Sequence, residues 1–228
     1  MKSGVIGLVE SGNKKLNDFT STVEVEGDQW TELNQSLQVT GNFQLDSKRI
    51  GQLARAAMED ISSVEKTEID EEGNIRTYED DEKIVRTTDL LFVPGSFIVV
   101  GSSAGKFAFE LISNNTSNNI THLEFDISSY VESQQDANPW KAGFYDRKGY
   151  AESGVVHGEQ LLSGSEIKNI LDSSPKNQIG LEYNYKNILI RNFITESGYV
   201  EVYEPTDYSS GEFAEYVENE LIPYARKP

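Results

Sequence analysis

The sequence contains no cysteine and only two histidines among its 228 residues. The lack of cysteine excludes a disulfide scaffold, a zinc–cysteine site, a cysteine nucleophile and an iron–sulfur cluster. No apolar run approaches the roughly 20 residues that a transmembrane helix needs, and the apolar run at residues 5–9 is too short for a signal peptide. We therefore expect a soluble, cytoplasmic protein that does not associate with a membrane.

Positive charge is also scarce, because 20 Lys and Arg residues face 38 Asp and Glu residues, a net charge of −18. The deficit is spread along the chain, with −9 in residues 1–115 and −9 in residues 116–228. A protein that binds the phosphate backbone of duplex DNA needs clustered Lys and Arg. The composition therefore argues against duplex DNA as the partner.

Strand patterns outnumber helix patterns in this chain. Helical spacing of apolar residues predicts three helices, at 46–61, 163–171 and 212–221. Alternation with period two predicts strands at 37–45, 106–112, 120–127, 179–185, 188–194 and 199–203. Hairpins are expected from 66–70 to 75–78 and from 141–147 to 151–157, and the interrupted apolar run 90–101 indicates two short buried strands or one bent strand.

These elements favour an α+β fold, mainly of antiparallel sheets with about three helices packed on one face. Ten of the eleven tyrosines lie between Tyr130 and Tyr224, and a polar loop occupies residues 113–119. We therefore expect an N-terminal α+β lobe with an acidic hairpin at 1–115 and a tyrosine-rich α+β lobe at 116–228. Two similar sheet-plus-helix lobes are one arrangement that fits this division.

The segment 97–106 looks at first like a strand followed by a phosphate-binding loop. A P-loop needs four residues between its glycines and Ser or Thr after its lysine. Here three residues separate Gly101 from Gly105, and Phe107 follows Lys106. Because residues 107–111 alternate like a strand, we interpret 101–106 as a hairpin loop, and no motif in the chain requires a cofactor.

The two histidines raise the question of a metal site. His122 and Glu124 share one face of the predicted strand 120–127, and together with His157 they could supply a two-histidine, one-carboxylate metal site. A solvent-exposed strand face explains the same alternation. A metal- or carboxylate-dependent hydrolase stays an alternative, but no catalytic motif supports an enzyme.

The second half offers an aromatic surface. Tyr183 and Tyr185 share one face of their predicted strand, and Tyr199 and Tyr203 share a face of theirs. If these faces coincide, they form a platform suited to a protein interface, or one that stacks single-stranded bases while Lys186 and Arg191 contact phosphates. The alternative is that the rings belong to the core.

A second candidate is the acidic segment 65–82, which holds nine acids and two bases. Its acidic strip comprises Asp70, Glu71, Glu72, Glu79, Asp80, Asp81 and Glu82. The segment lacks EF-hand spacing, so it is either a solvated hairpin or a strip that occupies a basic groove of a partner. We therefore expect a non-catalytic protein-interaction module, with a single-strand binder or an acidic DNA mimic as the alternative.

Overall fold

The computed structural model describes residues 1–26, 30–134, 136–146, 152–159, 161, 169 and 174–227. Within them the fold is α+β and mostly antiparallel sheet, which confirms the predicted class. The strands are β1 (Ser3–Ser11), β2 (Phe19–Glu24), β3 (Glu32–Gln44), β4 (Ile50–Ile69), β5 (Ile75–Val93), β6 (Phe97–Val100), β7 (Asn119–His122), β8 (Glu124–Phe125), β9 (Asn138–Phe144), β10 (Gly154–His157), β11 (Lys176–Tyr185), β12 (Ile188–Thr195), β13 (Tyr199–Glu204) and β14 (Ala225–Arg226). The helices are α1 (Phe107–Asn115), α2 (Ile127–Ser133) and α4 (Ser210–Tyr216), which a π-helical turn (Val217–Leu221) extends.

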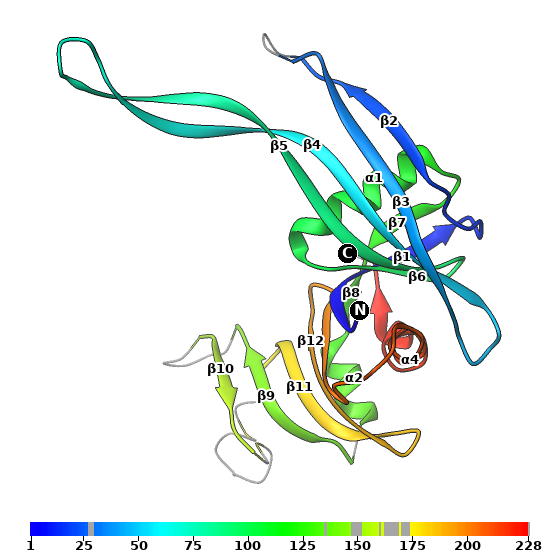
Figure 1. The fold of residues 1–228 in the computed structure, drawn as a ribbon. Coiled ribbons are helices and arrows are strands. Elements are labelled where there is room, and N and C mark those ends of the chain that lie inside the picture. Colours follow the sequence, from blue (N-terminus) through cyan, green and yellow to red (C-terminus); the bar gives the residue numbers. More distant parts are fainter. Residues whose placement is uncertain are drawn as a thin grey trace.

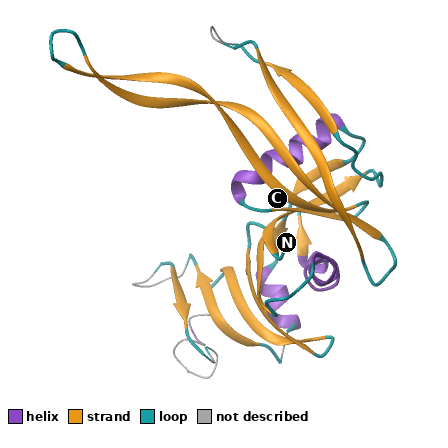
Figure 2. Ribbon diagram, in the orientation of Figure 1, coloured by secondary structure: helices purple, strands orange, loops and turns teal. Residues whose placement is uncertain are grey.

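One sheet runs through the described chain in the order β10-β9-β11-β12-β13-β1-β6-β5-β4-β3-β2, and β7 also pairs with β1 (Figures 1 and 2). All its pairings are antiparallel. Strand β1 lies at its centre, between β13 from the second half of the sequence and β6 from the first. The division of the chain into lobes at 115/116 stays a prediction.

The central strands are buried on both faces. Along β6, Phe97 and Val99 join the apolar cluster that contains α2 and α4, whereas Ile98 and Val100 join the cluster that contains α1. Strand β5 alternates in the same way between Val93 on the first side and Phe92 on the second. Such double burial explains why the apolar run at 90–100 is nearly continuous. The two predicted buried strands are present there as the end of the 19-residue β5 and the four-residue β6, so only the second is short.

The predicted helix at 46–61 is wrong, because this segment forms a turn and the first half of β4. Strand β4 bonds to β3 on one side and to β5 on the other. Ala54 and Ala56 are fully buried under α1, and a Cβ atom at Gly51 would overlap the ring of Phe43. Pairing on both edges therefore overrides the helix propensity of the alanines.

The predicted strand at 106–112 is also wrong, since these residues lie in α1 with Ala108, Leu111 and Ile112 buried. Residues 101–106 therefore lead from β6 into a helix and do not close a hairpin. The predicted strand 120–127 is interrupted: β7 ends at His122, and Asp126 caps α2, accepting a hydrogen bond from the N–H of Ser129 (3.0 Å).

Most of the remaining predicted elements are present in the structure. Strands β3, β11, β12 and β13 match the predicted segments, and both predicted hairpins are present as β4–β5 and β9–β10. Helix α4 begins with a capping box formed by Ser209 and Glu212, in the region where the third helix was predicted. The predicted helix at 163–171 lies outside the described residues apart from position 169.

Candidate interaction surfaces

The β4–β5 hairpin extends far beyond the rest of the sheet. Strand β3 pairs with β4 only as far as Gln35↔Met58, whereas β4 and β5 remain paired to Ile69↔Ile75. Residues 59–85, which we call the arm, therefore form a twisted two-stranded ribbon that projects from the body of the molecule (Figure 1). The hairpin therefore places the acidic segment 65–82 outside the body of the molecule.

A side-chain clamp marks the point where β3 separates from β4. The Oε2 atom of Glu59 accepts hydrogen bonds from the backbone N–H of Asn34 (2.8 Å) and from its Nδ2 (3.0 Å). The Nζ atom of Lys83 lies 3.2 Å from the same oxygen. The Asn34 N–H is the main cause that lowers the pKa of Glu59, and the Lys83 ammonium adds to it.

The register gives the arm two different faces. On one face Lys66 forms ion pairs with Asp80 (2.7 Å) and Glu82 (2.9 Å), and Arg86 pairs with Asp60. These contacts lower the pKa of Asp80, chiefly through its hydrogen bond to Lys66. On this face, which we call the paired face, most carboxylates therefore have a cationic partner within the hairpin.

On the opposite face, which we call the acidic face, the one cation of the arm is Lys83, and it pairs with Glu59 at the base. Glu65 lies directly opposite Glu79, and Asp81 lies opposite Ser63. Over the described residues, the carboxylates of Glu65, Glu79 and Asp81 form no ion pair. Like charges placed directly opposite each other destabilise a strand pair, so the acidic face carries a cost that folding alone does not explain.

Apolar side chains lie at the tip of the same face. Ile69 and Ile75 form the last pair of the ribbon and are 72% and 74% exposed. The turn that follows is held by Asp70, whose Oδ1 accepts from the N–H groups of Glu72 (3.0 Å) and Asn74 (2.8 Å). The predicted acidic strip thus divides among this turn (Asp70, Glu71, Glu72), the paired face (Asp80, Glu82) and the acidic face (Glu79, Asp81).

The four predicted tyrosines do not form one surface. Tyr183 and Tyr185 are only 7% and 9% exposed and point into the core beneath α2 and α4. Strand β12 separates their strand from that of Tyr199 and Tyr203, and the latter pair lies on the outer face of the sheet. The single tyrosine platform expected from the sequence is therefore corrected to two pairs on opposite faces.

The inner pair belongs to a buried polar network. The hydroxyl of Tyr183 lies 3.0 Å from that of Tyr130 and 2.9 Å from that of Tyr216. The Nδ2 of Asn192 donates to the Tyr130 hydroxyl (2.7 Å), and its Oδ1 accepts from the N–H of Leu181 (3.1 Å). Burial raises the pKa of Tyr130 to about 12. These phenols are therefore neutral and satisfied within the core.

The outer pair lies in a patch of aromatic and cationic side chains. Tyr203 packs edge-on against Trp140 (5.6 Å between centroids), and the guanidinium of Arg191 lies 4.6 Å above the Trp140 ring. The Nζ of Lys141 lies 3.7 Å above Phe193, which also contacts Tyr199. Cations therefore lie over the rings of Trp140 and Phe193, whereas Tyr203 stays 39% exposed. Stacking of single-stranded bases on this patch stays a prediction.

Sequence reasoning missed Trp140, Lys141 and Phe193. A bulge between β9 and β11 at Gly180/Leu181 brings Trp140 and Lys141 to the same face of the sheet, and period-two alternation cannot reveal this. Phe193 was accessible to prediction, because it lies two residues after Arg191 on β12 and therefore shares its face of the strand. Lys186, by contrast, lies away from the patch, in the turn between β11 and β12, where it pairs with Asp46.

The structure does not bring the predicted metal ligands together. His122 lies on β7, which pairs with β1, whereas His157 lies on β10. Four strands lie between β10 and β1 in the sheet, which puts these two strands about 24 Å apart. The Nε2–H of His122 donates to the carbonyl oxygen of Ser197 (2.9 Å), and burial lowers its pKa. Among the described residues, no group of three or more His, Asp or Glu could hold a metal ion.

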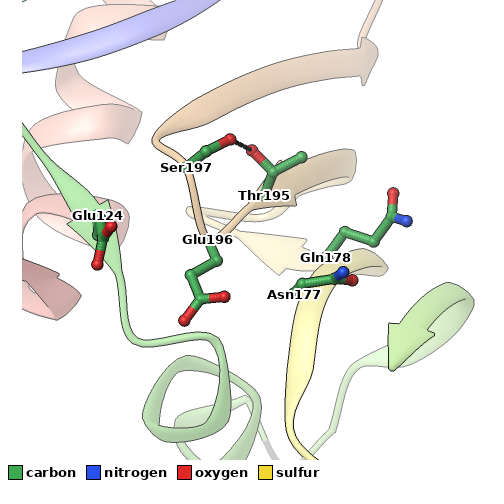
Figure 3. A pocket seen from close by; sticks show the side chains of 6 residues that line it. All are labelled: Glu124, Asn177, Gln178, Thr195, Glu196 and Ser197. Atoms are coloured by element: carbon green, nitrogen blue, oxygen red, sulfur yellow. Dashed lines mark hydrogen bonds between the residues drawn. The ribbon is translucent and has the colours of Figure 1, made fainter. Parts of the chain in front are cut away.

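A polar pocket of about 380 Å³ lies beside the turn between β12 and β13. Figure 3 shows Glu124 and Glu196 on one side of it, and Asn177 and Gln178 on the other. Three of its groups have partners, since the Glu196 carboxylate pairs with Arg226 (3.1 Å) and the hydroxyls of Thr195 and Ser197 lie 3.0 Å apart, whereas the Oδ1 of Asn177 is buried without a hydrogen-bond partner. The pocket therefore presents no positioned nucleophile and base.

Comparison with known proteins assigns the chain to no family. No protein-family model matches the chain, and none of the curated proteins compared with it has a significantly similar sequence. Over its described part, the chain also contains no helix of sufficient length and apolar character to cross a membrane.

Proposed function

We propose that the protein is a non-catalytic interaction module that binds another protein through the acidic face of its arm. The observation that carries this proposal is the row of carboxylates at Glu65, Glu79 and Asp81, which have no cationic partner within the described chain. A partner that brings Lys or Arg to this face would relieve their mutual repulsion and gain electrostatic complementarity.

The exposed isoleucines at the tip support the same proposal. Ile69 and Ile75 place a pair of apolar side chains in solvent beside the acidic residues. Exposed apolar groups that adjoin polar ones are typical of protein interaction sites. A two-stranded hairpin is also only marginally stable in water without a further layer, so a bound partner would order the arm.

Tyr199 and Tyr203 form a second, smaller part of the proposed surface. They remain on the outer face of the sheet, where Tyr203 is 39% exposed. Amphipathic rings of this kind contribute to interfaces at low entropic cost. Tyr183 and Tyr185 are not part of this surface, because their rings are buried in the core.

To test the proposal, the protein is immobilised and used to capture binding partners from an extract of its native host. The variant Glu65→Lys/Glu79→Lys/Asp81→Lys reverses the acidic face, and we expect it to bind a purified captured protein at least about tenfold more weakly. The matched control is Glu24→Lys/Glu26→Lys/Glu32→Lys on the neighbouring β2–β3 hairpin, which changes the net charge by the same amount. Equal loss in both variants would mean that overall charge, and not the arm, is responsible.

A deletion provides an independent control. Replacing residues 60–84 by an Asn-Gly turn removes the arm and leaves the base of β4 and β5 paired with its neighbours. We expect the shortened protein to fold and to lose the captured protein. If it still captures the same protein with unchanged affinity, the arm is not the binding element. Release of that protein by single-stranded DNA would identify the partner as one with a nucleic-acid groove.

A further inference from the structure

The outer edge of β5 has no neighbouring strand along the arm. Strand β6 pairs with β5 only between Leu90 and Val93, and from there to the tip at Ile75 the only described strand paired with β5 is β4. The other edge of the arm, along β4, is covered at its base, where the clamp of Asn34 and Glu59 holds β3 beside it. The free edge of β5 is therefore the longer of the two.

The register shows which backbone groups lie on this free edge. In an antiparallel pair, residues bonded to each other alternate with residues whose N–H and C=O groups point outward. Asp70 donates its N–H to the carbonyl oxygen of Asn74 (2.9 Å), so even-numbered residues bond across the arm. The carbonyl oxygen of Asp89 accepts from Gly101 on the side away from β4 (3.1 Å), and the pairs run without a shift from Asp89 to Ile75. The odd-numbered residues from 75 to 85 therefore point their backbone groups to the free edge.

These outward groups are available for pairing. Over the described residues, the N–H groups of Thr77, Glu79 and Lys83 form no hydrogen bond. Natural proteins commonly protect an edge with proline, a bulge or a short strand, whereas residues 75–85 contain no proline and no register shift. Two strands alone are marginally stable in water, and a third strand stabilises them. The edge therefore offers a template for an added strand.

The charge of the arm selects the kind of strand that pairs with it. Residues 59–85 hold 11 Asp and Glu against three Lys and Arg, so a second copy of the arm is repelled. The odd-numbered residues carry their side chains on the acidic face, where an added strand places its own side chains directly opposite Glu79 and Asp81. On the same face Ile75 and Val85 are 74% and 63% exposed. Two basic residues at alternate positions, with an apolar residue toward each end, match this face.

We propose that the arm binds an extended basic segment of another protein, which adds to the sheet as a third strand along the free edge of β5. Backbone hydrogen bonds to the odd-numbered residues supply affinity, and Lys or Arg opposite Glu79 and Asp81 supplies selectivity. This mode of binding rests on the proposed function of the arm, and it adds the element of the partner that binds there.

NMR titration with the synthetic peptide VTTTKTKTTTI tests the proposal. In an antiparallel orientation the two lysines lie opposite Glu79 and Asp81, and the terminal valine and isoleucine lie near Val85 and Ile75. We expect saturable shifts along β5, and amide exchange at Thr77 and Glu79 that slows by about tenfold or more. The outward amides of the β4 edge keep contact with solvent, so their exchange should not slow.

Modified peptides separate backbone pairing from charge. N-methylation of the two lysine amides removes the N–H groups that face β5 and keeps both charges, so we expect it to abolish the protection. N-methylation of the threonine amides that follow each lysine blocks groups that point away from β5, and it should leave binding intact. In VTTTKKTTTTI one lysine moves to the other face of the strand, and binding should weaken by about three- to tenfold.

A matched pair of variants identifies the edge. Thr67 and Thr77 lie directly opposite each other, and their N–H groups point to the two different edges of the arm. Proline at either position leaves every bond between β4 and β5 in place. We expect Thr77→Pro to weaken binding of VTTTKTKTTTI by at least about fivefold, and Thr67→Pro to change it by less than about twofold.

The proposed function and this mode of binding fail separately. If Glu65→Lys/Glu79→Lys/Asp81→Lys loses the captured protein but Thr77→Pro binds it with unchanged affinity, the arm is the binding element and strand addition is wrong. Strand addition is also overturned by equal loss in the two proline variants, by saturable binding without protection of Thr77 and Glu79, or by no binding at up to about 5 mM peptide. Protection of the same amides that rises with protein concentration in the absence of peptide would identify a second copy as the occupant, contrary to the proposal.

Discussion

The base and the arm of the β4–β5 hairpin belong to the same two strands and share one unbroken register, yet their environments differ completely. At the base, Leu91 is fully buried opposite Leu53, and β3 and β6 flank the pair. In the arm, Ile75 is exposed and no third strand is present. Backbone pairing between β4 and β5 is therefore enough to form the hairpin along its whole length. Only its base, where β3 and β6 add pairing and burial, contributes to the stability of the fold.

The largest effect should come from truncating a buried side chain at the base. Leu91→Ala leaves a cavity in the core, and we expect it to reduce the free energy of unfolding by about 2–5 kcal/mol. Ile75→Ala in the arm should change it by less than about 0.5 kcal/mol. Chemical denaturation measures both. Similar costs for the two variants would show that the tip of the arm is covered in solution, contrary to the comparison.

A smaller, local effect is expected at the clamp between base and arm. Because the pKa of Glu59 is lowered in the folded state, its contribution to stability is present above the ordinary glutamate pKa, about 4.3, and is lost as the pH falls through the lower folded value. NMR titration of the Asn34 amide signal should therefore report a midpoint below that ordinary value. In Glu59→Gln this titration should vanish, and the amide of Asn34 should exchange faster with solvent. An unchanged titration would assign it to another carboxylate.

The smallest effect concerns the like-charged pair in the arm. Glu79→Thr places a threonine opposite Glu65 and removes the repulsion, in the same way that Thr67 already faces Thr77 two residues along. We expect amide exchange in the arm to slow by about twofold, while global unfolding stays the same. Glu68→Thr, on the opposite face and across from Arg76, is the control and should not slow exchange.

Local chemistry made several elements predictable. The turn at Glu72, Gly73 and Asn74 and the alternation on either side of it were sufficient to identify the tip of the arm. The Ser209–Glu212 capping box lies where the third helix was predicted, and the period-two segments at 179–203 formed the expected strands. In each case the signal lies within a few residues, because turn geometry and helix capping depend on adjacent backbone groups.

Other features depended on contacts that no local pattern contains. The segment at 46–61 has apolar residues at helical spacing, but β3 and β5 hold it in a strand. The alternation at 106–112 likewise suggested a strand, and burial of Ala108, Leu111 and Ile112 against the sheet produced a helix. Short apolar segments fit either periodicity, so tertiary packing makes the choice.

The sequence by itself therefore determined the class of fold, the acidity of the hairpin and the absence of cysteine chemistry. Only the tertiary structure decided which acids are balanced by cations, which tyrosines face the core, and that Lys186 pairs with Asp46 and Glu215. The physical reason is that composition and short-range pattern depend on neighbours along the chain. Charge pairing and burial depend on strands that the sheet brings together from far apart in the sequence.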